Sequence, residues 1–224
     1  MEISGNSIGI IAGLLSFSAY SLYVVSMLRG QCRPNRMTWW TLTAIGVGVA
    51  ISYYASGARQ TIWIAIAYVA GPLIISLLSF RYGEGGWGIL ERFCILGVAV
   101  SLLLWWIFKS PLMALVVSLL VDFFVLVPTM VKSILRPKGE YKIAWAIETA
   151  SNIINLFALE QWTFSLAIYP LYLIVVNMFI TTSLFWPRKR AIIESIEKPL
   201  KMLFRALARN LQTLLGQDSS LRSE

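Results

Sequence analysis

The chain has 224 residues, of which 58% are hydrophobic and 13% are charged, and its mean hydropathy is +0.71. Soluble globular domains are usually about 45–50% apolar and about 25% charged, so this composition excludes an ordinary water-soluble fold. The net charge of +8 would otherwise raise the question of nucleic acid. Because the basic residues lie between long uncharged blocks, we expect no nucleic-acid partner.

Seven apolar blocks follow one another along the chain, and each predicts a membrane-spanning helix. They occupy residues 8–28, 37–58, 60–80, 93–108, 110–131, 143–159 and 161–187. A helix needs roughly 17–25 residues to cross the hydrocarbon core of a bilayer, which most of these blocks provide. The fourth block is short, and we expect its helix to extend back to Trp87. The sequence therefore predicts an all-α membrane protein with seven transmembrane helices.

Positive charge is unevenly distributed between the two ends of these helices. With the N-terminus outside the cell, 17 of the 19 Lys and Arg residues fall on cytoplasmic segments, and only Arg59 and Lys109 fall on the other side. Basic segments are retained in the cytoplasm during membrane insertion. We therefore expect a multi-pass protein of the cell (inner or plasma) membrane, with its N-terminus outside and its C-terminus in the cytoplasm.

The first three and the last three helices form two copies of one unit. The loop "RPNRMTWW" follows the first helix and "RPKGEYKIAW" follows the fifth, and their Arg-Pro pairs, at Arg33 and Arg136, are 103 positions apart. A second copy of three helices would be inverted unless another helix crossed between the copies, and block 93–108 supplies it. The predicted architecture is a parallel 3+1+3 repeat. Its parts are a first three-helix bundle at 1–81, a hinge and linker helix at 82–109, and a second bundle at 110–187.

The tail is a separate feature. Apolar residues recur every three or four positions between 192 and 215, with Lys and Arg on other faces. This pattern predicts an amphipathic helix at 188–215 that lies on the anionic headgroups of the cytoplasmic leaflet. Helix-mediated homo-oligomerisation or docking of a partner is the second interpretation. The last residues, 216–224, are expected to be disordered.

Chemistry-bearing motifs are scarce in this chain. It contains no histidine, which removes the commonest metal ligand and the usual acid–base side chain near neutral pH. It also has no Gly-rich phosphate loop and no nucleophile motif. We therefore expect neither an enzyme nor a metal or cofactor site.

Polar side chains are concentrated in the second repeat. Inside a membrane they are costly, and they usually face the bundle interior or a wet cavity. Ser118, Asp122 and Thr129 share one stripe of the fifth predicted helix, and Glu148 and Asn152 share a stripe of the sixth. We expect these stripes to converge at the interface between the two bundles.

The first repeat offers a different set of side chains. Its inward-facing candidates are aromatic or carry a hydroxyl group, among them Tyr20, Tyr23 and Ser76. The predicted cavity is therefore one-sided, with carboxylates and amides on one wall and aromatic rings on the other. Such a site suits a cation, an amine or a hydroxylated solute better than an anion.

These residues also have structural interpretations. Asp122 has no positive charge at its depth, because Lys132 is ten residues further along. Since burial disfavours a charged carboxylate, Asp122 is expected to be protonated for part of the time, and it either contacts a solute or locks a neighbouring helix. Pro128 removes a helix hydrogen bond, and with Thr129 it forms either a hinge or a static kink. Trp145, at the entry of its helix, is expected to lie in an interfacial belt.

The pattern "RPNRMTW … D-x₅-PT-x₂-K-x₄-P-x₂-E-x₄-W" resembles uncharacterised bacterial members of the SWEET and PQ-loop (MtN3-like) superfamily. The likeness covers residues 8 to about 187, in topology more than in identity. It implies a 3+1+3 transporter fold and a binding-pocket asparagine in the last helix, here Asn177. Thr129 stands where the family usually has Gln, and among the helices that carry prolines in sugar-transporting members only the fifth has one here. The resemblance therefore implies the fold without naming a substrate.

The leading functional hypothesis is a transporter of a small polar solute that works by alternating access. Asp122 or Glu148 would contact the solute or exchange protons during transport. The alternative is a non-transporting membrane receptor or assembly protein on the same fold, which would act through its basic face and tail.

Overall fold

A computed structural model describes residues 4–34, 36–83, 110–135, 137 and 140–186, with isolated positions at 96, 99, 100, 103, 106, 107 and 202. Of Pro128 only the backbone is described. The described residues form helices and no strand. The helices are α1 (Gly5–Leu28), α2 (Arg36–Ala55), α3 (Ile62–Tyr82), α5 (Pro111–Leu135), α6 (Lys142–Leu156) and α7 (Phe164–Phe185).

The all-α prediction is confirmed for this part of the chain, and four helices, α1, α3, α5 and α7, are long and apolar enough to cross a membrane. The chain is therefore a helical membrane protein. Helix α6 ends at Leu156, before the predicted limit at 159, because residues 157 and 158 form a turn. The described positions between 96 and 107 are all helical, but most of the predicted linker helix and of the predicted tail helix lies outside the described residues.

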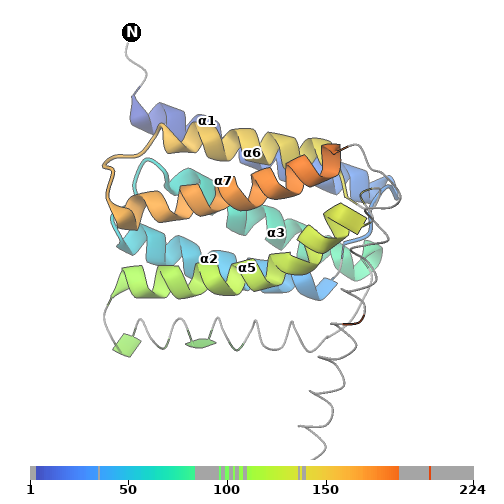
Figure 1. Cartoon of the computed structure of the whole chain (residues 1–224), viewed down its shortest axis with the longest axis horizontal. Helices are drawn as coiled ribbons and strands as arrows, with labels where there is room; N and C mark the ends of the chain where they lie inside the picture. Colours follow the sequence, from blue (N-terminus) through green and yellow to red (C-terminus); the bar gives the residue numbers. More distant parts are fainter. Residues whose placement is uncertain are drawn as a thin grey trace, which may run out of the picture. The chain divides into compact units, whose positions relative to one another are not determined.

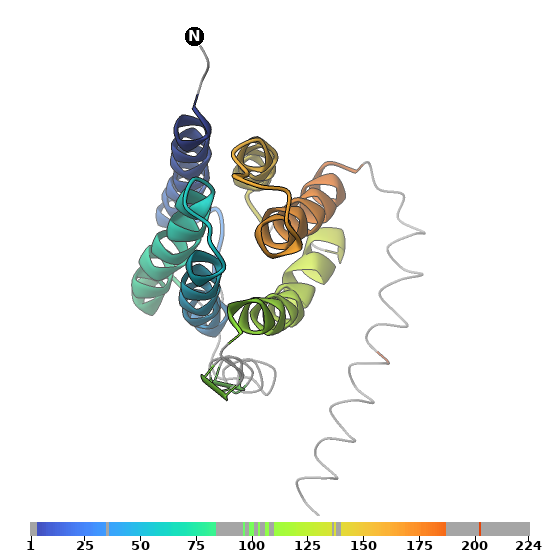
Figure 2. The ribbon, with the colours of Figure 1, turned by 90° about the vertical axis from the view of Figure 1, so that its left-hand side faces the viewer.

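The described helices from α1 to α7 belong to one compact unit, in which they make a closed ring. Neighbours pack in the order α1, α3, α2, α5, α7, α6 and back to α1, as Figure 2 shows in a view along the helices. We call α1–α3 the first bundle and α5–α7 the second bundle. The bundles meet along two seams, α1 against α6 and α2 against α5.

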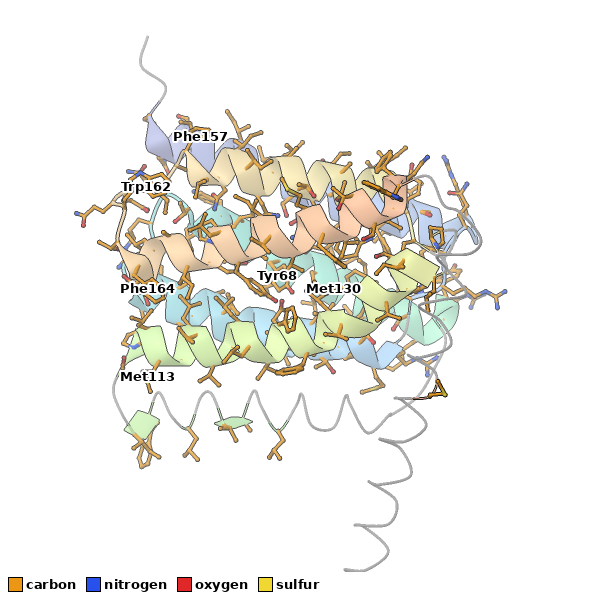
Figure 3. The ribbon with its side chains drawn as sticks, in the orientation of Figure 1. Tyr68, Met113, Met130, Phe157, Trp162 and Phe164 are labelled. Atoms are coloured by element: carbon orange, nitrogen blue, oxygen red, sulfur yellow. The ribbon has the colours of Figure 1, made fainter. Side chains whose placement is uncertain are left out.

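The helices run side by side, so the ring has two ends (Figure 1). The α2–α3 and α6–α7 turns lie at one end, which we call the turn end. Residues 29–34 and 140–141 lie at the other, which we call the basic-loop end. Exposed aromatic residues, among them Phe157, Trp162 and Phe164, gather at the turn end (Figure 3), as is typical of side chains at a membrane–water interface.

Small residues allow α1 to approach its neighbours closely. A Cβ atom on Gly9 would lie 1.8 Å from the carbonyl oxygen of Gln60, and one on Gly13 would lie 2.8 Å from the Cβ of Trp63. On the other side of α1, the Ser151 hydroxyl donates to the Ala12 carbonyl at 2.7 Å. Because lipid gives apolar helices little reason to associate, close backbone contact and hydrogen bonds of this kind hold membrane bundles together.

The turn end is fastened by hydrogen bonds between the two bundles. The Glu160 carboxylate accepts from the backbone N–H groups of Arg59 and Gln60, and from the Thr61 hydroxyl. It therefore satisfies backbone donors of the turn that leads into α3. The Tyr53 hydroxyl bonds the Thr61 hydroxyl at 2.8 Å and donates to the Leu166 carbonyl, at the start of α7, at 2.9 Å.

Replacing Tyr53 with Phe should loosen this end. The change leaves the buried Leu166 carbonyl without its Tyr53 donor, and we expect the free energy of unfolding to fall by about 1–2 kcal/mol. Thermal unfolding of the purified protein in detergent measures the effect. The matched control is Tyr54→Phe, since the Tyr54 side chain is 53% exposed and its ring keeps the stacked Arg59 guanidinium. Equal losses in the two variants would contradict the role given to Tyr53.

Candidate functional site

A cavity of about 50 Å³ lies between the two bundles, and it is the candidate binding site. Five aromatic side chains line it, namely Tyr20, Tyr23, Trp39, Tyr68 and Trp145. Its polar side chains from the second bundle are Glu148 and Asn177. The rest of the lining is apolar and comes from Ala19, Leu42, Pro72, Leu126, Ala144 and Leu173. We call this space the central cavity.

The lining lies toward the basic-loop end. Tyr23 is near the end of α1, Trp39 is near the start of α2, and Trp145 is near the start of α6, all at that end of the ring. The cross-bundle hydrogen bonds of Tyr53 and Glu160 lie at the opposite end. The central cavity and the fastened end therefore occupy different levels of the ring.

The aromatic wall depends on close packing in the first bundle. A Cβ atom on Gly71 would lie 2.2 Å from the Tyr20 ring, so this ring rests directly on the backbone of α3. The Tyr23 and Trp39 rings lie 5.0 Å apart and join α1 to α2. Behind them, outside the helices, the Cys32 thiol donates to the Tyr23 carbonyl at 4.0 Å, and burial raises the pKa of this thiol.

Glu148 is the carboxyl group of the cavity wall. Its side chain is 6% exposed, and the Ser16 hydroxyl of α1 lies 2.9 and 2.8 Å from its two carboxyl oxygens. Four residues further along α6, the Asn152 amide donates to the backbone carbonyl of Glu148 at 2.8 Å. Glu148 therefore joins the α1–α6 seam and faces the central cavity.

Asp122 connects three helices. Its side chain is 1% exposed, and its two carboxyl oxygens accept from Tyr68 of α3 and Tyr172 of α7, each at 2.5 Å. Such short O–H···O distances are typical of hydrogen bonds to a carboxylate. Tyr68 lies in the interior of the ring (Figure 3) and also lines the central cavity, so it links Asp122 to that space.

Both interior carboxyl groups are held by hydroxyl groups. The salt bridge found among the described residues joins Lys132 to Glu140 at 2.8 Å, near the basic-loop end, and the Trp145 indole also donates to Glu140. A buried carboxyl group that has hydroxyl donors but no fixed cation is free to be protonated or to pair with a cationic ligand.

Several buried polar atoms of α6 and α7 have no hydrogen-bond partner in the described structure. They include the Tyr169 hydroxyl, the Asn152 carbonyl oxygen and both polar atoms of the Asn155 amide. The Tyr169 ring packs on Tyr53 at 4.9 Å, and its hydroxyl lies within electrostatic reach of both Asp122 and Glu148. Buried polar groups are nearly always satisfied, so these atoms are places for water or for polar atoms of a ligand.

The structure brings most of the predicted site residues to the interior, but it does not bring them to one place. Tyr20, Tyr23, Glu148 and Asn177 line the central cavity, whereas Asp122 lies behind Tyr68. The Asn177 amide also donates to the Leu173 carbonyl of its own helix.

Two of the predicted hydroxyl residues lie elsewhere. The Ser76 hydroxyl donates to the Leu73 carbonyl of its own helix. Ser118 lies at the α2–α5 seam, where a Cβ atom on Gly48 would be 3.6 Å from its oxygen. Neither belongs to the described lining of the cavity.

The predicted hinge at Pro128 and Thr129 lies within α5, which is assigned as one continuous helix over these positions. Its ribbon bends near the labelled Met130 (Figure 3). A bend at this level is what proline produces, by removing a donor and crowding the preceding turn. The bend is compatible with both a hinge and a static kink.

Three partners of the acids were missed in the sequence, and one tryptophan was misassigned. Tyr68, Tyr172 and Ser16 complete the environments of Asp122 and Glu148, and their periodic spacing does not distinguish them from ordinary core residues. Trp145 was expected in an interfacial belt, and this was wrong, because it lines the central cavity and donates to Glu140.

Comparisons with known proteins leave the site to be interpreted from its own geometry. A scan against protein-family models, a search of curated proteins and a search of solved structures each found no match to this chain.

Removing the Asp122 carboxyl group should destabilise the ring. In Asp122→Leu the hydroxyls of Tyr68 and Tyr172 lose their acceptor, and we expect the free energy of unfolding to fall by about 1–3 kcal/mol. Asp122→Asn keeps the shape of the side chain and one carbonyl acceptor, so its free energy of unfolding should fall by less. Thermal unfolding in detergent compares the two variants. A leucine variant as stable as the unmodified protein would show that the three-helix junction does not depend on this acid.

Proposed function

We propose that this protein is a transporter that carries a small polar solute across the membrane by alternating access. The observation that carries the proposal is the central cavity between two bundles, which contains a buried carboxyl group, while one end of the ring is fastened by cross-bundle hydrogen bonds. A transporter needs a site that faces one side of the membrane while the other side is closed. The cavity toward the basic-loop end and the closed turn end fit one such state.

A two-fold repeat supports the proposal. Exchanging α1 with α5, α2 with α6 and α3 with α7 converts every neighbour pair of the ring into another neighbour pair. With the predicted linker helix at 93–108 included, this arrangement corresponds to a 3+1+3 fold of seven spans, as the resemblance to the SWEET and PQ-loop superfamily implies. In transporters built this way, the two halves rock about a site near their interface.

Charge supports an orientation. Basic residues cluster at the basic-loop end, among them Arg29, Arg33, Arg36, Arg81, Lys132 and Lys142. Under the positive-inside rule this end faces the cytoplasm of a cell (inner or plasma) membrane, and the N-terminus lies outside. The central cavity then faces the cytoplasm, and the amphipathic tail lies on the cytoplasmic leaflet.

The interior carboxyl groups provide a way to couple transport to protons. Asp122 and Glu148 lie in the membrane interior with hydroxyl partners, and intramembrane acids commonly relay protons in transporters. Bending of α5 at Pro128 would move Asp122 relative to α3 and α7. In this proposal a proton or solute at the acids biases the hinge and hence the side to which the cavity opens.

Uptake into proteoliposomes tests the function. A labelled hexose, polyol, amino acid and amine are offered in turn, and we expect at least one to enter faster than into protein-free liposomes. Asp122→Ala should abolish that uptake, because it removes the acceptor of Tyr68 and Tyr172. Deleting 188–224 should leave uptake unchanged for a transporter. A receptor or assembly protein that acts through its tail would show no uptake of any solute and would lose its partner on deletion.

Proton coupling has its own test. If an interior acid exchanges protons, uptake by the unmodified protein should respond to an imposed pH gradient, and Asp122→Asn or Glu148→Gln should remove that response. The amide replacements keep the shape of each side chain while removing its ability to ionise. Normal transport by both variants at every pH would mean that neither acid couples protons to the solute.

A further inference from the structure

We propose that the ligand of the central cavity is a small organic cation, an amine or a quaternary ammonium, whose charge pairs with Glu148 among the aromatic rings. This inference rests on the proposed function in one respect only, namely that the same cavity is the transport site. It concerns what the cavity binds, which is measurable without any flux.

The sign of the charge follows from the lining. Glu148 is the only ionisable acid or base among the residues described in the cavity wall, apart from the tyrosine phenols. A second carboxyl group, that of Asp122, lies behind Tyr68. An anionic ligand would therefore face negative charge at short range in a medium of low dielectric constant, whereas a cation would compensate it.

Glu148 is placed to receive such a cation. Ser16 supplies one hydroxyl group to the two carboxyl oxygens, at 2.9 and 2.8 Å. The Asn152 side chain is a second hydrogen-bond partner of the carboxyl group. A carboxylate has about four lone-pair sites, so two donors leave acceptor capacity for a ligand. The Ser16 contact also restrains the orientation of the Glu148 carboxyl group, because the donor belongs to the neighbouring helix α1.

The aromatic rings favour an organic cation over a hydrated metal ion. Tyr20, Tyr23, Trp39, Tyr68 and Trp145 all line the space. Aromatic faces attract alkylammonium groups by cation–π interaction, and aromatic cages are a recurrent means of binding them. A metal ion instead needs several protein ligands, usually from acidic, cysteine or histidine side chains. Among the described residues, no three or more of these side chains gather in a group that could hold a metal ion.

The same lining disfavours a sugar. Much of its polar capacity is already used, because Tyr68 donates to Asp122, Trp145 donates to Glu140, and the Asn177 amide donates to Leu173. Beyond these groups the wall offers a sugar the Tyr20 and Tyr23 phenols, the Trp39 indole and the Glu148 carboxyl group, and the rest of it is alanine, leucine and proline. A sugar would bury hydroxyl groups without partners, at a cost of roughly 1–3 kcal/mol each. An alkylammonium ion presents methyl and methylene groups to this wall.

The size of the cavity agrees with a small ligand. A volume of about 50 Å³ accommodates about four water molecules, because each needs roughly 10–15 Å³. This bulk corresponds to a compact ammonium ion rather than to a long chain.

The test is binding by the full-length protein purified in detergent, measured by calorimetry and by thermal shift. The probes are choline, its neutral isostere 3,3-dimethyl-1-butanol, and glucose. Choline should bind at least tenfold more tightly than the neutral alcohol, and glucose should not bind measurably. Equal affinity for choline and the alcohol, tighter binding of glucose, or no binding of choline would each overturn the inference.

Three variants locate the site. Glu148→Gln should weaken choline binding at least tenfold and leave the affinity for the neutral alcohol nearly unchanged. Trp39→Leu should weaken choline binding several-fold, whereas Trp162→Leu, at a side chain that is 73% exposed at the turn end, should not. If Glu148→Gln fails to fold, the two tryptophan variants and the comparison of probes on the unmodified protein still show whether the cavity binds an organic cation. Unchanged choline affinity in Trp39→Leu would overturn the assignment.

Flux and binding separate the two proposals. Choline binding without choline uptake in proteoliposomes retains the cation site and rejects the transporter. Uptake of the hexose or polyol with no choline binding retains the transporter and rejects the cation site.

Discussion

The interior of this ring depends on one constraint, which is that a carboxyl group buried among membrane helices must be satisfied by its neighbours. Asp122 meets the constraint by accepting from tyrosines on α3 and α7, so one side chain fixes the relative positions of three helices. An unsatisfied polar group in a membrane interior costs several kcal/mol, so these contacts are strongly selected over alternatives in which the helices rotate. Glu148 meets the same constraint through Ser16, and in doing so holds the α1–α6 seam.

These contacts also separate the ring into levels with different tasks. At the turn end, Tyr53 and Glu160 tie backbone groups of one bundle to those of the other. Toward the basic-loop end, the wall of the central cavity consists mainly of rings and aliphatic side chains, whose packing has little directional preference. At the level of the cavity the two bundles are also joined, through the acids, by Ser16 to Glu148 and by Tyr68 to Asp122. These are the cross-bundle bonds that the proposed alternating access would have to break.

Much of the fold could be predicted from the sequence, because apolar blocks of helix length have one stable outcome in a membrane. The helical segments were found in this way, as were the interior acids, since a charge within an apolar block is conspicuous. The partners of the acids could not be predicted. Tyr68, Tyr172 and Ser16 contact them from other helices, and which faces meet is decided by the rotation and order of helices in the ring. Trp145 shows a second limit, because a tryptophan at a helix entry has the same sequence pattern whether it faces lipid or a cavity.

Under the proposed repeat, the two halves of the ring differ in their polar side chains. At the 103-residue offset of the two Arg-Pro pairs, Ala19 is the counterpart of Asp122. With a gap of two residues, Tyr169 is the counterpart of Tyr68. Tyr68 has its acid, whereas the Tyr169 hydroxyl is buried without a partner and Ala19 lines the cavity. The same holds for the seams, because Ser16 and Glu148 at α1–α6 correspond to the buried apolar pair Leu119 and Ile45 at α5–α2. Ala19 lines the central cavity, whereas Asp122 lies behind Tyr68. The two halves of the ring therefore contribute different side chains to this space.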